Sequence, residues 1–331
     1  MAKVCKRQLS SLTNKEKVVV LIGPTAVGKT SLSIELAKQF NGEIISGDSM
    51  QIYKGMDIAT AKITKEEMNG IPHHLIDILE PDDSFSVAQF QELVRTKITE
   101  ITERGHLPII VGGTGLYIQS VLYDYQFQDT ASDLEYRSNL ELLAEKEGTE
   151  YIHSMLSQVD PESAANIHHH NVRRVIRALE VHHVTGKKMS ELQKEQKGEL
   201  LYDASIIGLT MDRDLLYDRI NFRVDQMMEQ GLLKEVEYFY NKGLRNCQSI
   251  QAIGYKEMFQ YMEGTKSLEE SIEELKQNSR RYAKRQLTWF RNKMGVKWFD
   301  MTESVKIGDI SKKIEEISSY IEGMLQKKQN T

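Results

Sequence analysis

Residues 23–30 read GPTAVGKT, which follows the apolar run of residues 18–22 and precedes the helix-like stretch of residues 31–40. This is the G-x-x-x-x-G-K-T pattern, with strand, glycine loop and helix in the order that a phosphate cradle needs. Successive backbone N–H groups of such a loop point inward, and the helix N-terminus adds partial positive charge. Lys29 supplies a point charge and Thr30 a hydroxyl for Mg²⁺. The sequence therefore predicts a phosphorylated ligand on Gly23, Pro24, Thr25, Ala26, Val27, Gly28, Lys29 and Thr30.

Short apolar runs alternate with helical patterns in the first third of the chain. Residues 43–46 and 107–111 are apolar and end at glycine-bearing turns, and helical patterns at 31–40 and 86–103 precede them. This alternation predicts an α/β fold with a mostly parallel sheet flanked by helices.

The expected domain organisation has three segments. Residues 1–121 form the first part of the α/β core. Residues 122–201 lack strand signals, and their helical patterns predict an all-helical insertion. Residues 202–331 complete the core with one strand, at 205–210, and then only helices.

Composition indicates an ordinary soluble protein, with 331 residues, 40% of them apolar and 27% charged. The two cysteines, Cys5 and Cys247, form no disulfide framework, and no apolar run approaches the length of a membrane span. We expect a cytoplasmic protein without a membrane partner. No signal for an oligomer or an obligate protein partner is evident, so a monomer is the default. The net charge of −5 still allows a nucleic-acid ligand on a local basic face.

Polar residues follow the expected strands at the edge where open parallel sheets bind ligands. Asp48, Ser49, Met50 and Gln51 follow the second strand, and Thr114 follows Gly112 and Gly113 after the third. From position alone, Asp48 is a general base, an outer Mg²⁺ partner or a cap on the next element.

Two basic helical segments stand out in this acidic chain. Arg219 and Arg223 are four residues apart and share a helical face, which suits a second clamp on a diphosphate, although a solvated face is the alternative. Residues 280–293, RRYAKRQLTWFRNK, interleave basic and aromatic side chains, which suits either an RNA contact or an amphipathic core helix. Another basic cluster lies at residues 173–177 in the insertion.

The adjacent histidines at 73–74, 168–170 and 182–183 have no accompanying cysteine or H-E-x-x-H pattern. We therefore expect no zinc site.

Taken in order, the motifs resemble bacterial tRNA dimethylallyltransferases. The resemblance spans residues 18 to about 300, and it rests on GPTAVGKT, GDSMQIYKGMDIATAK, PHHLIDI, GGTGLY, RRVIRALEV, IGYKE and RRYAKRQLTWFR. It implies a P-loop NTPase-like core, Mg²⁺ as cofactor and an insertion that touches the anticodon stem-loop of tRNA. The implied reaction moves the dimethylallyl group of dimethylallyl diphosphate to N6 of adenosine 37, in tRNAs that read codons beginning with U. The usual glycine of the DIGTAK segment is Ala59 here.

The resemblance also implies residue roles. Asp48 is the base that takes the proton from the adenine amine, with Thr30, Arg219 and Arg223 stabilising the leaving diphosphate. The residues implied to contact tRNA are Asp48, Ser49, Met50, Gln51, Thr114, Arg173, Arg174, Gly254, Tyr255, Lys256, Arg281 and Arg285.

Two other classes of function remain open from the sequence. A P-loop kinase for a nucleotide or a small molecule would use the same loop for ATP, and Asp77 could serve as its Mg²⁺-holding acid. A non-catalytic RNA-binding protein would use the loop only to sense a nucleotide.

Overall fold

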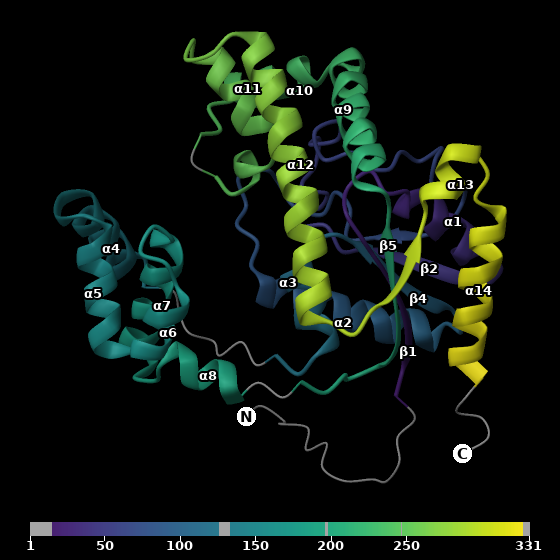
Figure 1. Ribbon diagram of the computed structural model, residues 1–331, viewed down its shortest axis with the longest axis horizontal. Helices are drawn as coiled ribbons and strands as arrows, with labels where there is room; N and C mark the ends of the chain where they lie inside the picture. The colour runs from purple at the N-terminus through teal and green to yellow at the C-terminus, as the bar shows by residue number, and fades with distance from the viewer. Residues whose placement is uncertain (1–14, 126–132, 196–197, 246, 327–331) are drawn as a thin grey trace, which may run out of the picture. The chain divides into compact units, whose positions relative to one another are not determined.

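Parallel strands form the centre of the fold in the computed structural model (Figure 1), which describes residues 15–125, 133–195, 198–245 and 247–326. The strands are β1 (Lys17–Ile22), β2 (Gly42–Ser46), β3 (His73–His74), β4 (Leu107–Gly112), β5 (Asp203–Thr210) and β6 (Lys297–Asp300). They make one sheet in the order β3-β2-β4-β1-β5-β6, and every pairing is parallel. The predicted α/β fold with a parallel sheet is confirmed.

β1 is the central strand and reads as an unbroken apolar run because both of its faces are covered. Val19 and Leu21 are fully buried, and both belong to a core that includes Leu36 of α1 (Lys29–Gln39) and Ile317 of α14 (Ser311–Gln326). Since side chains alternate along a strand, the neighbouring residues of β1 point to the opposite face. There α2 (Val87–Glu103) packs against β2, β4 and α3 (Gly115–Leu122).

The remaining helices of the larger unit follow β5. They are α9 (Arg213–Gln230), α10 (Leu232–Asn241), a 3₁₀ turn η1 (Ser249–Gln251), α11 (Tyr255–Met262), α12 (Leu268–Lys293) and α13 (Thr302–Ile307). The long helix α12 contacts α9, α11 and α3 (Figure 1). Its N-terminus is fixed by a capping box, in which Ser267 and Glu270 satisfy each other's backbone N–H groups.

The expectation of one strand followed only by helices after residue 202 is wrong, because β6 follows α12 and pairs with β5. β6 has four residues, and only Phe299 is buried. A strand this short at a sheet edge leaves no detectable period in the sequence.

The chain divides into two compact units. One contains the residues up to Leu122 and from Leu200 onward, and the other is Tyr123–Glu199. The smaller unit consists of α4 (Leu134–Glu147), α5 (Thr149–Val159), α6 (Pro161–Asn166), α7 (Val172–Thr185) and α8 (Met189–Glu195). These helices have their own apolar core, which includes Ile152, Leu156 and Val175.

Cys247 is a free thiol, and Cys5 lies outside the described residues. Within the described ranges, the helices are all too short or too polar to cross a membrane.

Candidate active site

The glycine loop joins the end of β1 to the start of α1, as the sequence predicts. Gly28 has a φ of 104°, a left-handed conformation that glycine adopts without strain, and it directly precedes the first turn of α1. Lys29 Nζ donates hydrogen bonds to the carbonyl oxygens of Gly23 (3.0 Å) and Pro24 (2.8 Å), so the ammonium group lies over the loop. Val27 is fully buried, and it can offer a ligand only its backbone.

Two cavities open beside this loop. The larger has a volume of about 920 Å³ and is lined by loop residues together with Thr30, Arg219 and Phe222. The smaller, of about 330 Å³, is lined on one side by Met50 and Ala59 and on the other by elements of α9, α11 and α12. The residues that line both cavities are Thr25, Asp48, Thr60, Ala61, Arg223 and Tyr282. Asp48 therefore lies where the two cavities meet.

Close backbone packing brings the turn after β2 against the turn after β4. A Cβ on Gly112 would lie 2.4 Å from the carbonyl oxygen of Gly47, so only glycine fits there. The backbone N–H of Ser49 donates to Thr114 Oγ1 (3.3 Å). Sheet geometry thus places Asp48, Ser49 and Thr114 together, although they are far apart in the sequence.

Asp48 and Lys29 lie in an environment that weakens both of their charges. Burial raises the pKa of Asp48, although the hydrogen bond from Met50 N to its Oδ1 (2.8 Å) and the Lys29 charge work in the other direction. Burial and the nearby Arg223 lower the pKa of Lys29 to about 7. A dianionic or trianionic ligand would relieve the repulsion between the two cations.

The arginine pair of α9 reaches the loop. Arg219 Nε donates to the carbonyl oxygen of Ala26 (2.9 Å), and an Arg223 guanidinium N–H donates to Thr25 Oγ1 (3.4 Å). Both arginines line the larger cavity, and Arg223 also lines the smaller one. Burial and the Arg219 charge lower the pKa of Arg223. The pair is therefore placed to contact an anion held by the loop.

Gln51 lines the larger cavity with Asp48 and is fixed by hydrogen bonds on both of its amide atoms. Its Oε1 accepts from Ser46 Oγ (3.0 Å), and its Nε2 donates to the carbonyl oxygens of Thr60 (3.3 Å) and Ala61 (3.4 Å).

The candidate RNA-contacting residues fall into three groups. Gly254, Lys256 and Arg285 line the smaller cavity together with Ser49 and Met50. Other basic residues are exposed outside the cavity linings, namely Arg281 on α12 and, in the smaller unit, Arg173 and Arg174 on α7. Tyr255 is fully buried, and its hydroxyl donates to Glu235 (2.7 Å).

The burial of Tyr255 does not fit the expectation that its side chain contacts RNA. Its ring packs against Phe239, below the surface of the smaller cavity.

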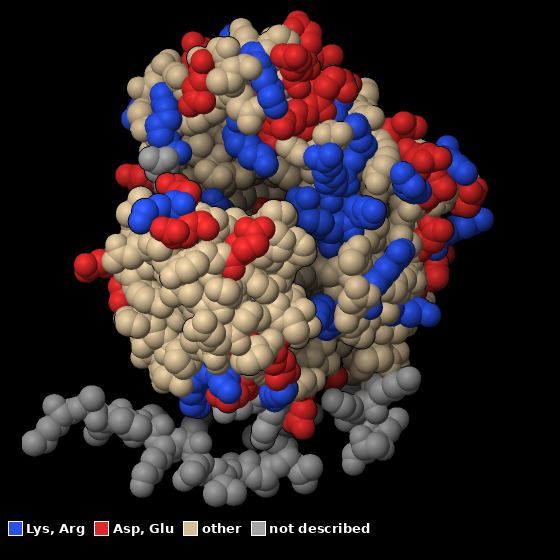
Figure 2. All heavy atoms as spheres, turned by 60° about the vertical axis from the view of Figure 1, so that its left-hand side comes forward, with Lys and Arg blue, Asp and Glu red and all other residues tan. Residues whose placement is uncertain are grey.

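The exposed basic side chains near the end of α12 are Arg281, Lys284, Arg285, Arg291 and Lys293, and Arg285 also lines the smaller cavity. Figure 2 shows lysine and arginine side chains gathered into a patch of their own on the viewed face, despite the net negative charge of the chain. The inner face of α12, with Ala283 and Phe290, is buried. The segment is therefore an amphipathic helix that buries one face and exposes basic side chains, and its contact with RNA stays a prediction.

Comparisons with known proteins agree with this geometry. The IPP transferase family model matches residues 51–293. A tRNA dimethylallyltransferase from Bacillus cereus (strain AH187) is 67% identical over 316 residues, which make up 96% of this chain and 98% of that protein. The chain belongs to the IPP transferase family.

Solved structures of the IPP transferase family share its fold. The full-length tRNA isopentenylpyrophosphate transferase from Bacillus halodurans matches with a TM-score of 0.73 and 56% identity, over 96% of this chain and 99% of that chain. A eukaryotic dimethylallyltransferase acting on tRNA matches with a TM-score of 0.76 and 33% identity, over 90% of this chain and 77% of that chain. The family resemblance seen in the motifs is confirmed.

Two site residues of this IPP transferase were missed by the sequence reasoning. Gln286 Oε1 accepts from the backbone N–H of Thr25 (2.9 Å), and its Nε2 donates to the carbonyl oxygen of Gly113 (3.1 Å), so it ties α12 to two of the site's loops. Tyr282, one turn earlier, lines both cavities, and burial raises its pKa to about 12. Their spacing of four, which places them on one face of a helix, was the available signal.

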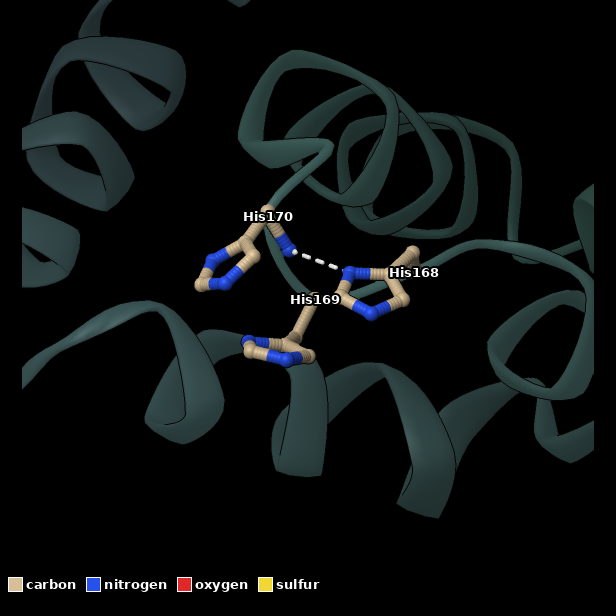
Figure 3. Close-up of side chains that lie close together, drawn as sticks. All are labelled: His168, His169 and His170. Atoms are coloured by element: carbon tan, nitrogen blue, oxygen red, sulfur yellow. Dashed lines mark hydrogen bonds between the residues drawn. The ribbon is translucent and has the colours of Figure 1, made fainter.

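The three histidines that precede α7 lie close together (Figure 3). Their nearest ring nitrogens lie within 4.8 Å of one another, as in some metal sites. However, His168 Nδ1 accepts a hydrogen bond from the backbone N–H of His170 (3.2 Å), which places the ring proton of neutral His168 on Nε2. Coordination by His168 would have to break this bond or move the proton, so we assign the cluster no metal.

Proposed function

We propose that this chain transfers the dimethylallyl group of dimethylallyl diphosphate to N6 of adenosine 37, on the 3′ side of the anticodon, in tRNAs that read codons beginning with U. The observation that carries the proposal is the meeting of two cavities at Asp48, one beside a phosphate loop and the other beside basic surface. A reaction between a diphosphate ester and a base of RNA needs this arrangement. The family relationship supports the same conclusion.

The larger cavity suits the diphosphate. The N-terminus of α1, the Lys29 ammonium and the Arg219–Arg223 pair all direct positive charge into it. In this reaction the diphosphate leaves as the C–O bond breaks, so these groups stabilise the negative charge that develops on the leaving oxygen.

The donor set also fits Mg²⁺, which prefers oxygen ligands and commonly bridges a P-loop hydroxyl to substrate phosphates. Thr30 offers an exposed hydroxyl at the start of α1 and lines the larger cavity. When bound there beside the diphosphate, the ion would offset charge on the leaving group.

Asp48 performs the proton transfer in this proposal. The adenine amine is a weak nucleophile because its lone pair is delocalised, so a base must remove an N6 proton as the N–C bond forms. Burial raises the pKa of Asp48, which makes its carboxylate a stronger base than an exposed aspartate. The balance is one N–C bond formed, one C–O bond broken and one proton moved to Asp48.

The smaller cavity suits the adenine base. To reach Asp48 the base must leave the stacked anticodon loop, as in other enzymes that modify bases. Met50, Lys256, Arg285 and the loop at Ala59 surround the space it would occupy. The larger unit would add contacts to the RNA through Ser49, Gln51, Thr114, Gly254 and Arg281. The helical insertion would contact the stem-loop through Arg173 and Arg174. Tyr255, being buried, supports this wall without touching RNA.

The contacts of Asp77 argue against a kinase, in which this residue would bind Mg²⁺. Asp77 is not among the described residues that line the two cavities, and its carboxylate is paired with Lys62 Nζ (2.5 Å).

Mass spectrometry of nucleosides tests the proposal. The protein is incubated with unmodified tRNA, dimethylallyl diphosphate and Mg²⁺, and parallel reactions contain ATP as the donor or no donor. We expect dimethylallyladenosine only with the diphosphate ester. Its absence, with ATP consumed in the presence of a small acceptor, would overturn the proposal in favour of a kinase.

A further inference from the structure

Glu235 lies in the first turn of α10, and its carboxylate accepts hydrogen bonds from four donors. Oε2 accepts from the backbone N–H groups of Asp57 (2.9 Å) and Ile58 (2.7 Å). Oε1 accepts from the backbone N–H of Ala59 (3.1 Å) and from the hydroxyl of Tyr255 (2.7 Å). One side chain therefore joins residues more than 170 positions apart in the sequence.

Three successive N–H groups that converge on one point form an anion-binding concavity, like those that hold phosphates in other proteins. Here the anion is the protein's own Glu235. Without a carboxylate at this point, the N–H groups of Asp57, Ile58 and Ala59 would repel one another and would lack their present partner.

The loop that Glu235 holds is one wall of the smaller cavity. Ala59, Thr60 and Ala61 line that cavity, and Gly254 lies across from them at close range. A Cβ on Gly254 would lie 3.0 Å from the Cβ of Ala59. Because Glu235 bonds both the loop and Tyr255, the residue after Gly254, it sets the separation between the two walls.

The same loop also reaches the proposed base. The carbonyl oxygens of Thr60 and Ala61 accept from Gln51 Nε2, and Gln51 accepts from Ser46 Oγ. The backbone N–H of Asp48 in turn donates to Ser46 Oγ (3.4 Å). A continuous run of hydrogen bonds thus connects the loop held by Glu235 to the turn that carries Asp48.

We propose that Glu235 is a positioning residue for the nucleic-acid substrate, which fixes the Asp57–Ala61 loop as the wall against which the extruded base packs. The inference rests on the proposed function. Ala59, whose backbone N–H is bonded to Glu235, lines only the smaller cavity, whereas Thr60 and Ala61 line both cavities. The glycine loop that would hold the diphosphate is anchored separately by Gln286. Loss of Glu235 should therefore affect binding of tRNA much more than binding of the diphosphate.

The test compares Glu235→Gln with the matched control Glu237→Gln. Both residues are on α10 and both changes remove one negative charge, but Glu237 is exposed to solvent. A glutamine at position 235 keeps one acceptor oxygen and turns an NH₂ group toward backbone donors, so part of the loop's anchoring is lost. The readouts are KM for tRNA, KM for dimethylallyl diphosphate, kcat, thermal stability and hydrogen exchange of the peptide that contains residues 57–59.

For Glu235→Gln we expect KM for tRNA to rise by about tenfold or more, the factor that corresponds to one lost hydrogen bond to a charged group. KM for dimethylallyl diphosphate should change by a much smaller factor, and the amides of residues 57–59 should exchange faster. Glu237→Gln should match the wild type in every readout.

Equal changes in both KM values, or a lower melting temperature with neither KM changed, would show a merely structural role and overturn the inference. Unchanged exchange at residues 57–59 would also overturn it, because the loop would not depend on Glu235. Failure of the wild-type protein to modify tRNA would instead contradict the proposed function, on which the role of Glu235 rests.

Discussion

At the scale of single residues, burial in the substrate-free protein disfavours the charged forms of Lys29, Asp48 and Arg223. The pKa of Lys29 is lowered to about 7 by burial and by Arg223. In the free protein at about pH 8 this ammonium is therefore mostly deprotonated, whereas at about pH 6 it is mostly protonated. A bound diphosphate favours the charged form and raises the pKa again.

Binding of dimethylallyl diphosphate should therefore take up protons at about pH 8, approaching one per site, and far fewer at about pH 6. Calorimetry in buffers with different ionisation enthalpies measures this number. Lys29→Arg is the matched control, because a guanidinium stays protonated at both pH values and should abolish the difference. Equal proton uptake in the variant would mean that another group is responsible.

Among individual residues, the sequence predicted those whose place in the fold follows from their immediate neighbours in the chain. GPTAVGKT is contiguous, so its type and context suffice to predict the loop, and Asp48 is found from its place after a strand. Gln286 could not be found in this way, because its partner Thr25 is 261 positions away and glutamine carries no chemical signature of its own. The buried position of Tyr255 was likewise hidden, since it depends on contacts with Glu235 and Phe239, which belong to another helix.

At the scale of elements, α12 has two different faces. Gln286 and Tyr282 point toward the site loops, while Arg281 and Arg285 are exposed. From the sequence, this segment was either an RNA contact or an amphipathic core helix, and the structure shows the amphipathic helix. The short strand β6 beyond it was missed, because pairing with β5 rather than local preference creates it.

The double variant Arg281→Gln and Arg285→Gln should weaken tRNA binding and flatten its dependence on salt, by about 0.7–0.9 in the log–log slope per lost phosphate contact. Affinity for dimethylallyl diphosphate should not change, because neither residue lines the larger cavity. Binding is measured by filter retention over a series of salt concentrations. Lys312→Gln, an exposed change on α14, is the control, and an unchanged slope in the double variant would remove α12 from the RNA interface.

At the scale of the whole molecule, the proposed reaction site lies within the larger unit, and we propose that the smaller unit holds the anticodon stem-loop. That smaller unit has an internal anchor of its own. Asp160 is 1% exposed, and its carboxylate accepts from the backbone N–H and the hydroxyl of both Ser163 and Ser190. Burial alone would raise the pKa of Asp160, but these hydrogen bonds lower it to about 2.

Because the folded-state pKa lies below the ordinary value, Asp160 stabilises the fold above about pH 4, and this contribution is lost as the pH falls toward 2. Asp160→Ala should lower the stability of the smaller unit by about 3 kcal/mol at neutral pH. It should also weaken tRNA binding while leaving the affinity for dimethylallyl diphosphate intact.

Thermal unfolding followed by circular dichroism, together with the two binding assays, checks this prediction. Glu162→Ala removes only an exposed ion pair with Lys194, so it should cost less than about 1 kcal/mol. A tRNA affinity that survives the loss of Asp160 despite an unfolded smaller unit would contradict the assigned role of that unit.

A single-turnover experiment with Asp48→Asn tests whether both substrates meet at Asp48. The variant keeps the size of the side chain and removes its ability to accept a proton. With saturating tRNA and dimethylallyl diphosphate, we predict a fall in the transfer rate by about 10²–10⁴-fold, with the affinities for both substrates retained. A transfer rate equal to that of the wild type would contradict this role of Asp48, because the proton of the adenine amine would then have to leave by another route.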